Sequence, residues 1–187
     1  MSGKDLQTLW TVGHSTRTWD QFAALLLAAD IQVLVDVRRF AGSRRHPQFS
    51  GTGMGSPLAG AGIEYVPMPE LGGRRAPHVD SVNTAWRNAG FRGYADYMQT
   101  PAYQGGRERL LDLARARSTA VMCAEAMWWQ CHRSLIADDF KSAGWTVIHL
   151  QAEGRQQEHP YTPAARIVDG RLDYGGDSSA STQPSLF

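Results

Sequence analysis

The chain has 187 residues, of which 42% are hydrophobic and 20% are charged, and its formal net charge is +1. This length favours a single domain with an adequate core, and the small net charge argues against a surface that is basic throughout, as in proteins that coat nucleic acid. Arginine carries nearly all the positive charge, since Lys4 and Lys141 are the only lysines; this bias suits recognition of carboxylates or phosphates, although a GC-rich genome also enriches arginine.

The first residues contain no apolar run, and no stretch approaches the ~18 apolar residues of a membrane span. We therefore expect a cytoplasmic protein with no membrane partner. In a reducing cytoplasm, Cys123 and Cys131 are expected to be thiols rather than a structural disulfide.

The first predicted elements are two strands and the helix between them. Residues 9–12 are typical of a short buried strand. Thr18 and Gln21 fit a capping box, which predicts a helix that extends to residue 29. The nearly continuous apolar run at residues 33–37 predicts a second strand in a parallel sheet covered on both faces.

Two long loops follow predicted strands. Residues 38–57 are expected to form a basic loop, residues 63–68 a third strand, and residues 69–92 a second loop rich in glycine and arginine. Loops of this length in a compact domain are usually functional or disordered. Ligands of open α/β sheets bind beyond the carboxyl ends of the strands, which is where these loops begin.

The remaining pattern alternates again between helix and strand. The predicted elements are helices at 94–98 and 103–116, a strand at 119–123, a helix at 130–143 and a strand at 146–150. Such alternation predicts an α/β fold with an open, mainly parallel sheet of about five strands and helices on both faces.

The last residues predict a small appendage and a tail. Asp169-Gly170 suits a type I′ turn, so residues 166–174 are expected to form a small C-terminal hairpin. Residues 175–187 are rich in Gly, Ser, Thr and Pro, which is typical of a disordered tail. We therefore expect one α/β domain at 1–174 and a disordered tail at 175–187.

Polar side chains follow the predicted strands, and their convergence at one edge of the sheet predicts a site. The candidates for proton transfer are His14, Asp36 and Glu125. Each has a structural alternative: a hydrogen-bonded histidine, an ion pair between Asp36 and Arg38, and a glutamate that neutralises an arginine.

The charge of the loops favours an anionic ligand. Residues 38–75 contain six arginines and two acidic residues. Backbone N–H groups at the start of the 130–143 helix would add to this field, and phosphate fits best. The candidate anion ligands are Ser15, Arg38, Arg44, Arg45, His132 and Arg133. The alternative is that the arginines point into water.

The two cysteines leave several chemical roles open. Cys131 is predicted near a helix N-terminus beside His132 and Arg133, and all three features favour a thiolate. Cys131 or Cys123 could be a nucleophile, the pair could form a redox switch, or both could be inert buried thiols. They could also bind a metal with a histidine, but their spacing matches no common zinc motif. The sequence does not identify a cofactor.

Several motifs in order along the chain carry a resemblance. They are Gly13-His14-Ser15, Val35-Asp36-Val37-Arg38, Ser43-Arg44-Arg45, Glu70-Leu71-Gly72-Gly73, Gly90-Phe91-Arg92-Gly93-Tyr94, Met122-Cys123-Ala124-Glu125 and Cys131-His132-Arg133-Ser134. Together they resemble the bacterial family catalogued as domain of unknown function 488. The resemblance runs from about residue 11 to 174 and implies an α/β domain with these motifs at one site, but no activity. Where the family usually has a fuller helix, residues 51–61 contain four glycines, so we expect the helix to be broken there.

The last five residues, Gln-Pro-Ser-Leu-Phe, resemble the peptide with which bacterial proteins dock on the replication sliding clamp. Gln183 would supply hydrogen bonds, and Leu186 and Phe187 would fill an apolar pocket. Pro184 stands where leucine is commoner. The alternative is a terminus with two chance apolar residues.

Three functions therefore remain open. The first is an enzyme that acts on a phosphate-bearing or nucleic-acid-derived substrate in the basic pocket. The second is a non-catalytic replication or DNA-repair module that docks on the sliding clamp. The third is a thiol redox protein.

Overall fold

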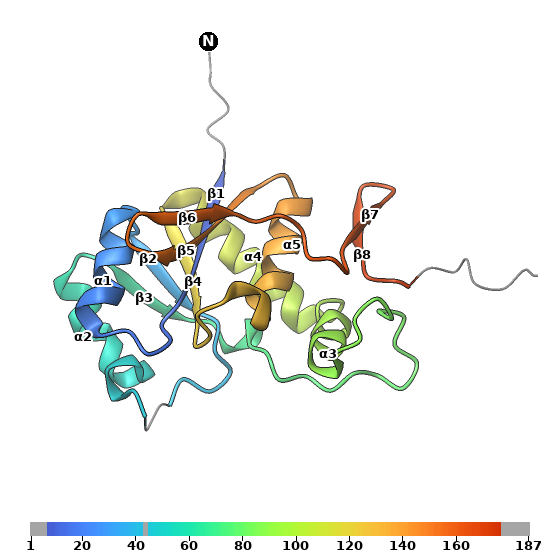
Figure 1. Ribbon diagram of the computed structural model, residues 1–187, viewed down its shortest axis with the longest axis horizontal. Coiled ribbons are helices and arrows are strands. Elements are labelled where there is room, and N and C mark those ends of the chain that lie inside the picture. Colours follow the sequence, from blue (N-terminus) through green and yellow to red (C-terminus); the bar gives the residue numbers. More distant parts are fainter. Residues whose placement is uncertain (1–6, 43–44, 177–187) are drawn as a thin grey trace, which may run out of the picture.

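The core of the molecule is one mixed sheet in the order β3-β2-β4-β1-β5-β6 (Figure 1). The structure is a computed structural model that describes residues 7–42 and 45–176. The parallel strands are β1 (Thr8–Gly13), β2 (Val33–Asp36), β3 (Glu64–Pro67), β4 (Thr119–Cys123) and β5 (Thr146–Ala152). The mainly parallel α/β fold is thus confirmed. Strand β6 (Arg155–Glu158), a polar edge strand antiparallel to β5, has no counterpart among the predicted elements.

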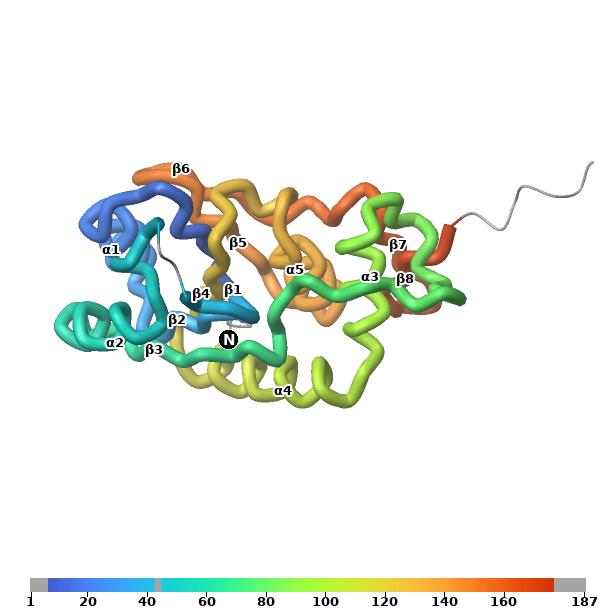
Figure 2. The backbone as a smooth tube through the Cα atoms, turned by 90° about the horizontal axis from the view of Figure 1, so that it is seen from below, coloured from blue at the N-terminus to red at the C-terminus, as the bar shows by residue number. Residues whose placement is uncertain are grey.

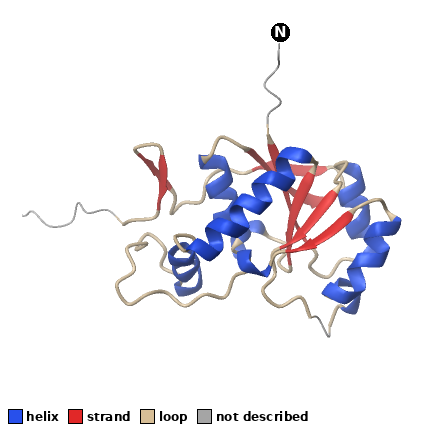
Figure 3. Ribbon diagram, turned by 180° about the vertical axis from the view of Figure 1, so that it is seen from behind, coloured by secondary structure: helices blue, strands red, loops and turns tan. Residues whose placement is uncertain are grey.

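Helices cover both faces of the sheet (Figures 1 and 3). On one face, α1 (Trp19–Ala28) and α2 (Gly51–Gly60) pack in a cluster that contains Leu34 and Met122. On the other face, α3 (Ala89–Tyr97), α4 (Pro101–Ala116) and α5 (Arg133–Ser142) pack against Val35, Val121 and Cys123. Because successive side chains of a strand alternate between faces, the position of Cys123 puts its sulfur on the side covered by α5.

The predicted ends of α1 are confirmed. The Thr18 hydroxyl accepts a hydrogen bond from the Gln21 N–H, and the Gln21 side chain accepts one from the Thr18 N–H. Phe22, Leu25 and Leu26 form the buried face of this helix. The cap therefore fixes where the chain turns back after β1, next to the carboxyl end of that strand.

The predicted break at residues 51–61 is wrong, because this segment forms the ten-residue helix α2. Ser50 caps the helix by accepting from the Gly53 N–H, and Met54 and Leu58, four residues apart, are fully buried against the sheet. Each glycine costs a helix roughly 0.5–1 kcal/mol relative to alanine. Burial of two large apolar side chains, at roughly 1.5–3 kcal/mol each, offsets that cost.

The helix predicted at 130–143 begins later than expected. Residues Trp128–Gln130 form a short 3₁₀ turn, Cys131 is extended, and α5 begins at Arg133. Cys131 therefore lies immediately before the helix rather than inside it. This position lets the backbone N–H of Arg133 point at the sulfur.

A long loop connects β3 to α3 and runs toward the end of the molecule that carries the small hairpin (Figure 2). The buried carboxylate of Asp96 holds this loop by accepting from the His78 N–H, the Ser81 hydroxyl and the Asn83 amide. The predicted hairpin is confirmed as β7 (Arg166–Val168) and β8 (Arg171–Asp173). In the described part of the chain, no helix has the length and apolar character needed to cross a membrane.

Candidate functional site

A pocket of about 350 Å³ opens where the chain leaves β2 and β4 at the carboxyl edge of the sheet. The segment after β2, the segment around Gly73, the start of α3 and the loop between β4 and α5 form its walls. The end of β1 lies directly behind that last loop. A Cβ atom on Gly13 would lie 1.7 Å from the Glu125 carbonyl oxygen, so only glycine permits this close approach.

Both cysteines line the pocket, and both are free thiols. Cys123 ends β4 and Cys131 precedes α5, and the two sulfurs lie close enough to affect each other's ionisation. The thiol of Cys123 donates a hydrogen bond to the Glu125 carbonyl oxygen, at 3.9 Å. The two cysteines are only 2% and 5% exposed. The part of each that is not covered by protein lines the pocket. The arrangement makes the two sulfurs unequal: that of Cys123 donates to a carbonyl oxygen, and that of Cys131 accepts from the Arg133 backbone N–H.

This inequality separates the pKa values of the two thiols. Burial would raise the pKa of Cys131, but the interaction with the Cys123 thiol and the positive charge of Arg133 lower it to about 7. The Arg133 backbone N–H also donates to this sulfur, at 3.5 Å. Burial and the interaction with Cys131 raise the pKa of Cys123 well above its usual value. Cys131 is therefore the thiol that can ionise near neutral pH.

His132 is placed to exchange a proton with Cys131. Its Nδ1 lies 3.5 Å from the Cys131 sulfur, and its Nε2 lies 3.1 Å from the Val37 carbonyl oxygen. A carbonyl only accepts, so Nε2 carries the hydrogen and Nδ1 is the free acceptor that faces the thiol. Burial lowers the pKa of His132, which keeps the imidazole neutral and able to accept.

Arg133 is buried behind the thiols and does not line the pocket. Its guanidinium donates to the hydroxyl of Thr11 and to the carbonyl oxygens of Glu125 and Ala126. No carboxylate in the described part of the chain lies within ion-pair distance of it. The cation is therefore free of a carboxylate partner and can favour negative charge on the Cys131 sulfur.

Asp36 and Arg38 form a buried ion pair at the end of β2. The Arg38 Nε and Nη2 donate to the two carboxylate oxygens of Asp36, at 2.9 and 2.6 Å, and the Tyr65 hydroxyl donates to the same carboxylate. The pair fixes the turn of the chain into the pocket, since the Arg38 backbone N–H also donates to Asp36. The Asp36 carboxylate is fully engaged in this structural role.

His14 lies on the far side of Arg38 from the pocket. Its Nε2 accepts from the Arg38 Nη1 at 3.2 Å, so the hydrogen is on Nδ1, which donates to the Ser15 carbonyl. The ring stacks on Phe49 at 4.5 Å. Burial is the main reason that the pKa of His14 falls to about 4. His14 is thus a neutral acceptor that orients Arg38.

The structure divides the predicted site residues into three groups. Those that line the pocket are Arg38, Cys123, Glu125, Cys131 and His132. Those that support lining residues from behind are His14, Asp36 and Arg133. Ser15 and the exposed Arg45 do not line it. Arg44 and the tail residues Gln183, Leu186 and Phe187 lie outside the described residues.

Two arginines outside the predicted set of anion ligands reach the pocket. Arg39 and Arg74 both line it, and the Arg39 guanidinium donates to the Arg74 carbonyl oxygen at 3.0 Å. Neither forms an ion pair with a described carboxylate. Arg74 has a φ of 59°, an uncommon conformation for a residue other than glycine. The six arginines of residues 38–75 indicated a basic pocket, but the sequence does not show which of them line it.

The lining of the pocket is electropositive. Of the described lining residues, Glu125 is the acidic one, and Arg38, Arg39 and Arg74 are the positively charged ones. Because Arg38 is neutralised by Asp36, the charge available to a ligand comes from Arg39 and Arg74. Phe40 is 65% exposed at the same wall and offers an apolar surface beside them. The described residues contain no group of three or more His, Cys, Asp and Glu side chains arranged to hold a metal.

Comparison with known proteins adds a family. Residues 18–140 match the family model described as "Domain of unknown function DUF488". The matched range includes the pocket, from Arg38 to His132. No curated protein matches the chain.

Proposed function

This chain belongs to the DUF488 family, and we propose that it is an enzyme in which Cys131 attacks a phosphate-bearing or nucleic-acid-derived substrate. The observation that carries the proposal is the meeting of two features in one pocket. The ionisable sulfur of Cys131 lies at the pocket that Arg39 and Arg74 line. A nucleophile needs a lowered pKa or an adjacent base, and Cys131 has both.

The proposed reaction needs a proton carrier, and His132 has the geometry for it. Its Nδ1 takes the proton of Cys131 while the sulfur bonds to the electrophilic carbon or phosphorus atom. The bond to the leaving group breaks, and the proton passes from His132 to that group. Water then displaces the sulfur from the intermediate, and the thiol of Cys131 is restored.

The proposed substrate class follows from the charge of the pocket. Guanidinium groups that lack a carboxylate partner favour bidentate contacts with phosphate oxygens. Arg39 and Arg74 meet that condition in the described part of the chain. Phe40, exposed beside them, would pack against an apolar or planar part of the same substrate.

A pair of alkylating agents tests this proposal. Bromoacetol phosphate and bromoacetone react alike with a thiolate, which forms an S–C bond as bromide leaves, but only the first carries a phosphate. Intact-protein mass spectrometry should show that the phosphate compound modifies Cys131 faster, with saturation and with protection by inorganic phosphate. Arg39→Ala and Arg74→Ala should abolish that preference, whereas Arg45→Ala, outside the pocket, should keep it. Equal rates for the two compounds in the native chain, with no protection by phosphate, would overturn the proposal.

The contact between the two thiols favours a second candidate, a redox role. The Cys123 thiol already lies close to the Cys131 sulfur. With hydrogen peroxide, the Cys131 thiolate would attack one oxygen and become a sulfenic acid. Cys123 would then displace water to form a disulfide. Mass spectrometry that finds no Cys123–Cys131 bond after such treatment would remove this candidate.

A further inference from the structure

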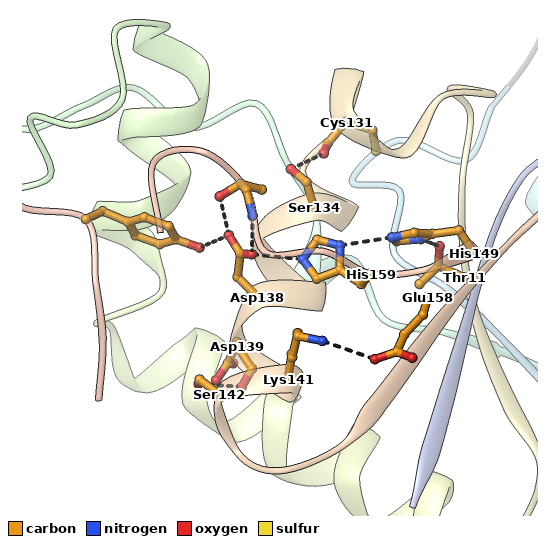
Figure 4. A network of polar contacts seen from close by, with 12 residues as sticks. Thr11, Cys131, Ser134, Asp138, Asp139, Lys141, Ser142, His149, Glu158 and His159 are labelled. Atoms are coloured by element: carbon orange, nitrogen blue, oxygen red, sulfur yellow. Dashed lines mark hydrogen bonds and ion pairs between the residues drawn. The ribbon is translucent and has the colours of Figure 1, made fainter. Parts of the chain in front are cut away.

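A chain of buried polar side chains runs from α5 to the centre of the sheet (Figure 4). The Asp138 carboxylate bonds to His159 Nε2 at 2.8 Å, and His159 Nδ1 lies 3.0 Å from His149 Nε2. The other ring nitrogen of His149 lies 2.6 Å from the Thr11 hydroxyl. All four side chains are at most 1% exposed, so no water competes for these bonds.

The Asp138 end fixes the direction of the hydrogen bonds. Its two carboxylate oxygens accept from the Thr162 N–H and hydroxyl, from the Tyr174 hydroxyl and from His159. His159 therefore carries its hydrogen on Nε2 and accepts on Nδ1. His149 then donates from Nε2 and accepts on Nδ1, where the Thr11 hydroxyl must be the donor.

The opposite arrangement, with a charged His159, leaves one hydrogen unsatisfied. His159 would then donate to His149, and His149 would donate to Thr11. The Thr11 oxygen would accept twice, because the Arg133 guanidinium also donates to it, at 3.2 Å. Its own hydrogen would have no acceptor among the described atoms, a costly loss at a buried position. Burial also lowers the pKa of His149 strongly, in agreement with a neutral ring.

This series of hydrogen-bonded side chains ends at the guanidinium of Arg133, which lies behind the two thiols. The Thr11 oxygen accepts from Arg133 Nη1, and the carbonyl oxygens of Glu125 and Ala126 accept from Nη2. The Arg133 Nε is buried and has no partner among the described atoms at hydrogen-bonding geometry. The guanidinium is thus held through its two terminal nitrogens, and its Nε–H group is left as an unused donor.

We propose that Thr11, His149, His159 and Asp138 are positioning residues that hold the Arg133 guanidinium against Cys131 and so stabilise its thiolate. The inference deepens the proposed function and rests on it, since it concerns the same sulfur. These four side chains hold Arg133 in place and do not conduct protons, because both ends of the hydrogen-bonded series are closed from solvent. Among the described residues, Arg133 has no carboxylate beside it. The negative charge of Asp138 acts on it instead through the hydrogen bonds of two neutral imidazoles.

Other groups also act on this sulfur and must be held constant in a test. Cys123 on β4 and His132 lie beside it, and Tyr94 on α3 lines the same pocket. A useful substitution therefore acts on Arg133 without touching these groups. Thr11 meets this condition, because it lies on β1, hydrogen-bonds Arg133 and has no bond to the sulfur.

The decisive pair of variants is Thr11→Val and Thr11→Ser. Valine keeps the shape and suits a buried strand, but it removes the hydroxyl that joins His149 to Arg133. We expect Thr11→Val to lower the rate of Cys131 alkylation by iodoacetamide about tenfold at pH 6, as for a pKa raised by about one unit. Thr11→Ser should restore the native rate. A folded Thr11→Val protein whose alkylation pH profile matches the native profile overturns the proposal.

A measurement on the native chain keeps the inference testable if Thr11→Val does not fold. Long-range ¹H–¹⁵N spectra should show that His149 and His159 each carry a single ring hydrogen, on Nε2. A charged His159, or His149 protonated on Nδ1, overturns the proposal. Iodoacetamide carries no phosphate, so failure here is distinct from failure of the proposed function. If the native chain showed no preference for bromoacetol phosphate, the proposed substrate class would be wrong. The stabilisation of the Cys131 thiolate through Arg133 would be unaffected.

Discussion

The sulfur of Cys131 lies 3.5 Å from Nδ1 of His132, the residue that follows it in the chain. Two adjacent residues can form such a pair here because Cys131 is extended and α5 begins directly after His132. The Val37 carbonyl, directly after β2, fixes the far side of the imidazole. The thiol and the imidazole are thereby aligned by the fold itself, as the proposed nucleophilic role requires.

Gly73→Ala should disturb this pair. A Cβ atom on Gly73 would lie 2.8 Å from the His132 Nδ1, so the imidazole must move away from Cys131. We expect slower alkylation of Cys131 at pH 7 and a loss of roughly 1–3 kcal/mol in the free energy of unfolding. Gly55→Ala is the matched control, because nothing lies within 4 Å of its added Cβ. A native alkylation rate in Gly73→Ala would contradict the assigned position of His132.

Asp36→Asn should be far more destabilising than Tyr65→Phe, although both remove hydrogen bonds within the same cluster. The first leaves the buried guanidinium of Arg38 without its carboxylate, at a cost of about 3–5 kcal/mol. The second removes one hydroxyl that donates to Asp36, at about 1 kcal/mol. Urea denaturation at pH 7 measures both. Equal losses would show that the ion pair does not fix the end of β2.

The stability of the fold should fall as the pH is lowered from 7 to 5. Burial lowers the pKa of His14 to about 4 and also lowers those of His132 and His149. Their ordinary pKa is 6.5, so below this value the unfolded chain binds protons that the folded chain does not. Each histidine then contributes at most about 1.4 kcal/mol of lost stability per pH unit.

Urea midpoints measured at several pH values check this prediction. His14→Gln keeps an acceptor for Arg38 but cannot titrate, so its stability should depend less steeply on pH. Unchanged or greater stability of the native chain at pH 5 would mean that these imidazoles are charged in the folded state.

Tyr174→Phe should cost more stability than Tyr97→Phe. The hydroxyl of Tyr174 donates to the buried carboxylate of Asp138, whereas that of Tyr97 donates to the neutral carbonyl of Glu70. Hydrogen bonds to charged groups contribute about 1.5–3 kcal/mol, and neutral ones about 0.5–1.5 kcal/mol. Thermal or urea denaturation gives both values. The reverse order would argue that Asp138 is not ionised.

The sheet could be predicted from sequence because its strands are short apolar runs separated by helical patterns. Strand β2 shows this best, since all four of its residues are buried. Strand β6 has no such run: its residues are polar and its place depends on pairing with β5. Helix α2 was missed for the opposite reason, because burial of Met54 and Leu58 outweighs the low helix propensity of its glycines.

The position of the candidate site followed from a topological rule, and its details did not. Parallel strands end at one edge, which brings Cys123 at the end of β4 to the same pocket as Arg38 after β2. Which loop arginines turn inward depends on single backbone angles, such as the positive φ of Arg74. No sequence pattern reveals these angles.

The buried chain from Asp138 to Thr11 was also beyond sequence reasoning. Thr11 and His149 are 138 residues apart, and each looks like an ordinary strand residue. Only the register of β1 against β5, which places the two side by side, brings them together.

The central claim, that Cys131 is the ionised thiol of the pocket, is tested most directly by the pH dependence of its alkylation. Iodoacetamide modification of the native chain, followed by peptide mass spectrometry, measures Cys123 and Cys131 separately. The account predicts that Cys131 reacts first, with a midpoint at about pH 7, and that Cys123 stays largely unmodified at that pH. A midpoint for Cys131 at the ordinary thiol value of 9.0, or faster reaction of Cys123, would contradict it.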